Sequence, residues 1–352
     1  MENSINIKRP PVSNGVRAAP EIAATKCNKG NCRLTFDSSI PALFGTIIIM
    51  FQQLLGAEIV SLNHVWTVDS PLLQGVHETY SVSQSMTHNG TLGAFPGGIS
   101  AATFQVNFSG QHGGPTVDAL GHIGLNNVLF DGTPATDIDG VNGLLKYGID
   151  EYPEDRYVNR GILVDIPYCK GNVDELLPQF YAISVDDITD CVAKEGIEIR
   201  EGDSVLIRTG WGSLFATDPI AYVTNYTGVG GEAASYLAEN KIFLTGTDVL
   251  AYDVANSPFP CHGILIAQSG IYIVESMNLE PLSKACLEKE TWEFALVLNP
   301  PKFKGLAAMP TNVFAIFMPE AEDCPSSAMD TFGPSFISVV VALLSLCFFT
   351  MG

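Results

Sequence analysis

Short apolar runs recur through the middle of the chain, between about residues 57 and 318. Each is about four to eight residues long, rich in β-branched residues and bounded by turn-forming residues, a pattern that favours strands over helices. The predicted strands are residues 161–166, 204–210, 241–248, 270–276, 294–299 and 312–317.

Two segments between these strands have the pattern of helices. Residues 184–196 open with Ser184 and Asp187 at capping-box spacing and end at Gly196, a common start and stop for a helix. Residues 230–240 place small and apolar side chains on one helical face. Because strands and helices both occur throughout, the sequence predicts one globular unit of the α/β or α+β class with a mixed central sheet, and we take α/β as the prediction.

The two ends of the chain differ from this middle region, so we predict three parts, residues 1–56, 57–320 and 321–352. Residues 1–39 are polar and contain three prolines, as in a disordered arm or a targeting sequence. The apolar segment 40–57 follows three basic residues, which is the charge order of a signal or signal-anchor segment. A buried helix of the fold is the alternative.

The tail, residues 336–351, is apolar over 16 residues, which is short for a membrane-spanning helix. Small residues at 326–328 and a spacer precede it, as in the signal for a lipid anchor. This predicts a secretory or cell-surface protein attached to a membrane through its tail. A tail anchor, a helix docked on the domain and a cytoplasmic protein are the alternatives. Acceptor triplets at Asn89, Asn107 and Asn225 would suit a secreted glycoprotein.

Charge and composition exclude several classes of function. The net charge is −20, and the body of the chain has no run of Lys or Arg, which argues against a nucleic-acid partner. The sequence contains no Gly-x-Ser-x-Gly motif of an α/β-hydrolase and no P-loop. Its eight cysteines allow disulfides but predict no pairing.

Candidate chemistry gathers in one glycine-rich run, residues 109–124. His112 lies six residues before Asp118, and His122 lies four residues after it. Oxygen and imidazole ligands of this kind suit zinc or manganese, although such histidines also serve as surface or core hydrogen-bonding residues. The neighbours Cys261 and His262 do not predict a catalytic dyad, because adjacent residues of a strand point to opposite faces.

The same run resembles the motif of the cyclase-like metal-dependent hydrolases, which include bacterial kynurenine formamidase and isatin hydrolase. That motif, His-x-Gly-Thr-His-x-Asp-x-x-x-His, here reads HGGPTVDALGH from His112 to His122. The resemblance covers about residues 57–318 and includes RGILVDIPYCKG and FPCHGILIAQSGIYIVESMNLEPL in family order. It implies the family's swivelling β/β/α domain and a homo-oligomer.

The resemblance also implies a centre of one or two divalent ions, zinc or manganese. It makes His112 and Asp118 metal ligands, and it adds His262 and Glu275 as ligands of a second metal. It makes His122 the general acid and base that takes the proton of a metal-activated water. The implied reaction is hydrolysis of a small amide, lactam or ester, as in arylformamidases, with the cleaved bond a carbon–nitrogen bond other than a peptide bond.

Thr116 departs from the family motif, because it stands where the second histidine ligand belongs. A hydroxyl is a poorer zinc ligand than imidazole, so Thr116 is a weak or lost ligand. Two other functions therefore stay open: a small-molecule binding protein without catalysis, and a metal-dependent lyase or dehydratase. Arg208 and Trp211 are either substrate contacts or a paired structural charge and a core aromatic residue.

Overall fold

The computed structural model describes residues 26–28, 31–33, 56–67, 70–71, 81–91, 99–105 and 114–319. The predictions for most of the N-terminal extension, for the C-terminal tail and for His112 lie outside these residues. Contacts divide the chain into two units, Ala57–Pro319 and a second made of Met1–Gly56 with Glu320–Gly352. Within the described ranges, none of the helices has the length and hydropathy that crossing a membrane requires.

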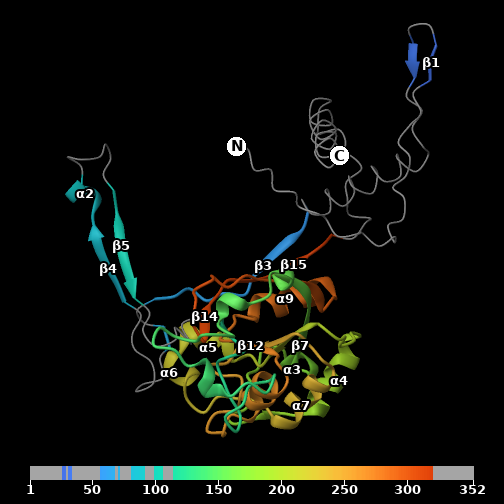
Figure 1. Cartoon of the computed structure of the whole chain (residues 1–352). Coiled ribbons are helices and arrows are strands. Elements are labelled where there is room, and N and C mark those ends of the chain that lie inside the picture. Colours follow the sequence, from blue (N-terminus) through green and yellow to red (C-terminus); the bar gives the residue numbers. More distant parts are fainter. Residues whose placement is uncertain are drawn as a thin grey trace, which may run out of the picture. The chain divides into compact units, whose positions relative to one another are not determined.

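A mixed sheet forms the centre of the larger unit (Figure 1), and nine strands of the described residues belong to it. Across the sheet these strands are β14 (Ala308–Pro310), β6 (Thr116–Asp118), β12 (Tyr272–Glu275), β11 (Leu244–Thr247), β9 (Ser204–Arg208), β7 (Val158–Asp165), β13 (Glu293–Leu298), β15 (Val313–Phe317) and β3 (Glu58–Ser61). The four strands from β12 to β7 are parallel, and the strands on either side of them pair antiparallel. The predicted α/β class with a mixed central sheet is confirmed, and all six predicted strands are present.

Shorter pairs and helices complete the described part of the chain. The small strands are β1 (Lys26–Asn28), β2 (Asn31–Arg33), β4 (Ser81–Met86), β5 (Ala101–Gln105), β8 (Ala182–Ile183) and β10 (Gly228–Val229). The helices are α2 (His88–Thr91), α3 (Ile166–Cys169), α4 (Val185–Glu195), α5 (Leu214–Thr217), α6 (Pro219–Tyr222), α7 (Gly231–Glu239), α8 (Pro260–His262) and α9 (Glu280–Lys289). A π-helical turn, η6 (Gly263–Gln268), follows α8 directly.

Both predicted helices are present, and α4 has the predicted caps. The Ser184 hydroxyl accepts the N–H of Asp187, and the Asp187 carboxylate accepts the N–H of Ser184. Gly196 ends the helix with φ at 68°, in the left-handed region that glycine adopts without a steric penalty. The caps therefore fix α4 between residues 184 and 196.

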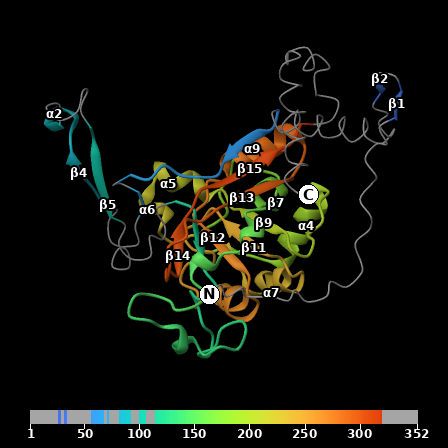
Figure 2. The ribbon, with the colours of Figure 1, turned by 45° about the horizontal axis from the view of Figure 1, so that its top comes forward.

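The sheet separates two apolar clusters. Along β9, Leu206 packs in a cluster with residues of α9, whereas Val205 and Ile207 pack in a second cluster with α4 and α7. Alternate residues of a strand point to opposite faces, so the two clusters are the two faces of the sheet. Figure 2 shows α7 and α9 on opposite sides of the central strands. The candidate site lies on the face that carries α7 and α8.

Candidate metal centre

Two neighbouring strands place three of the predicted residues on one face of the sheet. Thr116 and Asp118 are two residues apart on β6, so their side chains share a face. Thr116 pairs directly with Glu275 of β12, which brings that carboxylate to the same face. All three side chains are buried. The pairing of β6 with β12 therefore joins two sequence segments that lie more than 150 residues apart.

His262 of α8 completes the group, and Asp253 fixes its orientation. The ring Nδ1 lies 2.5 Å from Asp253 Oδ2, and the backbone N–H groups of Cys261 and His262 also donate to the Asp253 carboxylate. The other ring nitrogen, Nε2, lies 3.4 Å from Asp118 Oδ2 and 3.3 Å from Glu275 Oε1. One imidazole nitrogen is thus held by Asp253 while the other faces two carboxylates.

These carboxylates dominate the electrostatics of the site. Burial lowers the pKa of His262, but its hydrogen bonds to Asp118, Asp253 and Glu275 outweigh burial and raise that pKa well above the ordinary value. Buried carboxylates so close together need a positive charge between them, because their repulsion is not screened by water. Either a proton on His262 or a bound cation can supply that charge.

His122 lies on the turn that follows β6 and is only half-buried. Ligand atoms of Asp118, His122 and His262 all lie within 4.8 Å of one another, and the two imidazole ring centres are 6.2 Å apart. The N–H of Gly121 donates to the carbonyl oxygen of Tyr147, which ties the turn to the neighbouring loop. His122 is therefore the more accessible of the two clustered imidazoles.

Glu275 is held by the loop that also carries Asp253. The backbone N–H of Tyr252 donates to Glu275 Oε1 at 2.8 Å. Ser276, the next residue, has φ at 55°, and Phe259, directly before α8, has the same value. Backbone of this kind is unfavourable for residues other than glycine and gathers at functional sites. The residue directly after Glu275 and the residue directly before α8 thus both have left-handed backbone.

Thr116 lies at the site, but its hydroxyl forms a hydrogen bond within its own segment of the chain. Its side chain is fully buried, and Oγ1 donates to the carbonyl oxygen of Gly114 at 3.3 Å. The register with Glu275 nevertheless keeps the hydroxyl oxygen on the face that carries Asp118. The structure thus brings Asp118, His122, His262 and Glu275 together with Thr116 beside them, while His112 lies outside the described residues.

Neither Asp253 nor Tyr252 was predicted from the sequence, because both lie on a loop that is distant from the motif and reaches the site only in the folded chain. Asp253 lies nine residues before His262, a spacing that matches no helical or strand period. The one available signal was chemical: a metal-binding histidine needs a partner for its second nitrogen. Several carboxylates lie near His262 in the sequence, so this signal does not identify Asp253 as the partner.

Three other residues considered from the sequence have structural roles. Arg208 is buried and pairs with Asp165 at 2.9 Å and with Glu280 at 2.7 Å. The indole N–H of buried Trp211 donates to a backbone carbonyl oxygen. The segment with Cys261 is helix α8 rather than a strand, yet its thiol contacts the Val229 carbonyl oxygen and not the neighbouring imidazole. No cysteine–histidine dyad forms there.

Comparison with known proteins agrees with this fold. The family model described as putative cyclase matches residues 59–254. A crystal structure described as a novel cyclase is 25% identical, with a TM-score of 0.66 over 74% of this chain and 88% of that chain. Among curated proteins, none matches the chain.

Two isatin hydrolase structures are more distant in sequence. One, bound to the product analogue thioisatinate, is 19% identical with a TM-score of 0.58, over 80% of this chain and 100% of that chain. The other, isatin hydrolase A from Ralstonia solanacearum, is 17% identical with a TM-score of 0.56, over 80% and 98%. At these identities the likeness concerns the fold.

Proposed function

Because the chain belongs to the putative cyclase family, we propose that it is a metal-dependent hydrolase. The observation that carries the proposal is the setting of His262, with Asp253 on one ring nitrogen and Asp118 and Glu275 beside the other. The names of two similar structures, both isatin hydrolases, support this reaction class.

The residues present fit a divalent ion by the chemistry of their donor atoms. Asp118, His262 and Glu275 would hold it, and a carboxylate–imidazole set suits zinc and manganese. A bound ion would lower the pKa of a water molecule and polarise a carbonyl group. Since one ring nitrogen of His262 faces Asp253, its other nitrogen is the one available as a ligand.

His122 would carry out the proton transfers of the reaction, and the burial of the site shields the carboxylates from solvent. The imidazole of His122 can take a proton from water and return it to a leaving nitrogen. Its half-buried position lets it meet a substrate, whereas the carboxylates of Asp118 and Glu275 are buried. The substrate class we propose is a small amide, lactam or ester, with cleavage of a carbon–nitrogen bond.

Thr116 favours a second function, binding without catalysis. Its hydroxyl is engaged by Gly114, so one position that holds a histidine in the family motif supplies at most a weak ligand here. The same site would then bind a small molecule without hydrolysing it.

Metal content of the purified full chain tests the proposal. We expect at least about one equivalent of a divalent ion in the wild type and its loss in Asp118→Ala. Asp139→Asn is the matched control, because Asp139 is exposed and its substitution also removes one negative charge. Turnover of formyl anilides and lactams by the metal-loaded protein then separates hydrolase from binder. A wild type that takes up no zinc or manganese at neutral pH contradicts the proposal.

A further inference from the structure

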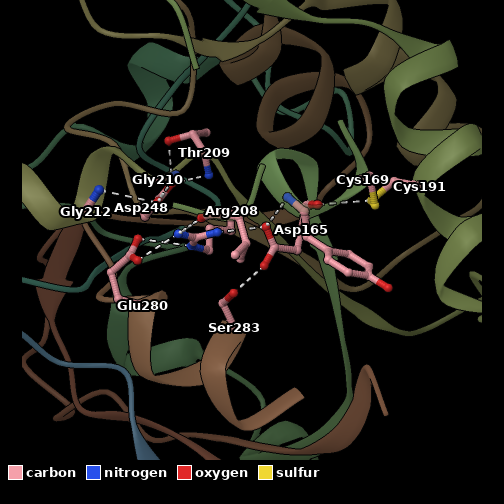
Figure 3. A network of polar contacts seen from close by, with 12 residues as sticks. Asp165, Cys169, Cys191, Arg208, Thr209, Gly210, Gly212, Asp248, Glu280 and Ser283 are labelled. Carbon is pink, nitrogen blue, oxygen red and sulfur yellow. Dashed lines mark hydrogen bonds and ion pairs between the residues drawn. A yellow bond between two sulfur atoms is a disulfide. The ribbon is translucent and has the colours of Figure 1, made fainter. Parts of the chain in front are cut away.

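A disulfide joins two helices near the carboxyl end of β7. Cys169 closes α3 and Cys191 lies on α4, and their sulfur atoms are bonded. Asp165, the last residue of β7, lies beside the disulfide and pairs through its carboxylate with Arg208 and Ser283 (Figure 3). None of these residues belongs to the candidate metal centre.

Glu195 lies against the disulfide. It is four residues after Cys191 on α4, so the two side chains share a helical face. Glu195 Oε1 accepts the backbone N–H of Asp165 at 2.9 Å and lies 3.7 Å from the sulfur of Cys169. A carboxylate oxygen of Glu195 and both sulfur atoms all lie within 4.8 Å of one another. The acid therefore contacts the bond that would open on reduction.

The second oxygen of this carboxyl group has no hydrogen-bond partner among the described residues. Glu195 is 7% exposed, and its Oε2 is buried without a hydrogen bond to any described residue. Burial, followed by the charge of Asp165, raises the pKa of Glu195 to about 9, so the group is a neutral acid at pH 7. One carboxyl oxygen of Glu195 lies within 4.8 Å of both sulfur atoms, so a thiolate released from the disulfide can accept the proton of this acid.

The two sulfur atoms differ in access. Cys191 is fully buried, whereas Cys169 is half-buried at the end of α3. The Nζ of Lys194 donates to the carbonyl oxygens of Tyr168 and Cys169 at 2.8 and 3.3 Å, which places a cation beside the accessible cysteine. Reactive cysteines occupy such electropositive, partly exposed positions. An external thiolate therefore reaches Cys169 first.

We infer that Cys169–Cys191 is a disulfide that exchanges with small-molecule thiols, with Glu195 as its proton donor. A thiolate forms a bond to the Cys169 sulfur, the Cys169–Cys191 bond breaks, and its electron pair goes to Cys191. Cys191 takes the proton of Glu195, leaving a thiol and a carboxylate. A second thiolate attacks the small molecule's sulfur in the mixed disulfide, which releases an oxidised small-molecule disulfide and the Cys169 thiolate. Solvent protonates Cys169 and Glu195, so two thiols are oxidised and one protein disulfide is reduced.

The surroundings accommodate the reduced state. The Cys191 sulfur lies 3.4 Å from the carbonyl oxygen of Asp165, which can accept the new S–H. The bonds of Asp165 to Arg208 and Ser283 do not involve either sulfur atom, so the end of β7 stays anchored when the disulfide opens. The nearby free thiol of Cys286 is buried, and this burial raises its pKa. Cys286 therefore stays protonated and does not compete.

Reduction of the full chain by glutathione tests the inference. Released thiols are alkylated at intervals, and the peptides containing Cys169 and Cys191 are quantified by mass spectrometry. At pH 7 we expect Glu195→Gln to slow reduction by at least about 10-fold, since a positioned general acid contributes on the order of 10²-fold or more. Glu198→Gln is the control, because the Glu198 side chain is 75% exposed. Equal rates in the wild type and Glu195→Gln overturn the inference, as does a folded wild type that glutathione cannot reduce.

The wild type alone provides a second test, which holds even if the Gln variant fails to fold. The rate constant per glutathione thiolate should be constant to about pH 8 and fall above about pH 9, as Glu195 loses its proton. The charged and titratable groups that face Glu195 are Asp165 of β7, Cys169 of α3, Lys194 of α4 and Cys286 of α9. Cys286→Ala should leave the profile unchanged. A profile that stays flat to pH 10 overturns the role of Glu195.

Discussion

At the scale of single residues, the site depends on Asp253, which does not face the proposed ion. Its carboxylate accepts hydrogen bonds from two backbone N–H groups and from the His262 ring. It therefore fixes both the helix start and the tautomer of the imidazole. A hydrogen-bond partner of this kind sets the basicity and the orientation of the ligand histidine without binding the metal itself.

We predict that Asp253→Asn weakens metal binding by about 10- to 100-fold, as loss of such a partner does elsewhere. The amide has nearly the same size but carries no charge, and its NH₂ group would compete for the ring nitrogen. Competition with a chromogenic chelator measures the affinity, with Asp139→Asn as the exposed control. An unchanged affinity for the metal ion would mean that metal binding by His262 does not depend on Asp253.

The buried acid Glu195 makes a prediction about pH and stability. Its pKa is about 9 in the folded chain and the ordinary 4.5 when unfolded. Between these values the folded state binds the extra proton, so the free energy of unfolding falls as pH rises, by up to about 1.4 kcal/mol per pH unit. Urea unfolding of the oxidised chain at pH 6 and pH 8 should show this slope in the wild type and a flatter one in Glu195→Gln. The same slope in both proteins would place the proton elsewhere.

At the scale of elements, local patterns predicted the centre of the sheet and missed its edge. The runs that became β7, β9, β11 and β12 each contain at least three consecutive apolar residues, which is the local pattern of a buried parallel strand. By contrast, β6 and β14 have three residues each, too few to show any period. β6 takes its position from pairing with β12, and β14 from pairing with β6, and both pairings join segments that are far apart in the sequence. The motif residues were therefore predicted from resemblance, and their register was not.

Gly121 shows how tightly the turn after β6 is packed. A Cβ atom at this position would lie 2.8 Å from a methyl group of Leu144 and 3.0 Å from both Ile138 Cδ1 and the Tyr147 carbonyl oxygen. We predict that Gly121→Ala costs about 1–3 kcal/mol, a common cost of overpacking, and displaces His122. The thermal midpoint should fall, whereas Gly231→Ala should be tolerated, because its nearest contact would be at 3.4 Å. Equal thermal midpoints in the wild type and Gly121→Ala would show that the turn after β6 can shift to accommodate the added methyl group.

At the scale of the whole molecule, one buried cation joins the sheet to a helix layer. Arg208 of β9 binds Asp165 of β7 and Glu280 of α9. We predict that Arg208→Met destabilises the fold by about 3–5 kcal/mol, because it leaves the buried Asp165 without its cation. Lys241→Met is the comparison, since Lys241 and its partner Glu201 are 70% and 74% exposed, and should cost less than about 1 kcal/mol. Denaturant midpoints distinguish the two, and similar losses would refute the role of the buried pair.

Metal removal links the site to the stability of the whole domain. Its ligands come from β6, β12 and α8, so they meet only in the folded chain, and an ion that binds them stabilises that chain by mass action. At a free ion concentration 100 times its Kd, this amounts to about 2.7 kcal/mol. A chelator should therefore lower the thermal midpoint of the wild type by several degrees, and added zinc or manganese should restore it. Asp118→Asn should show neither change, because it lacks a ligand but keeps the size of the side chain. A wild type whose thermal midpoint does not change with chelator would mean that the charge between the carboxylates is the His262 proton, and that the site folds without an ion.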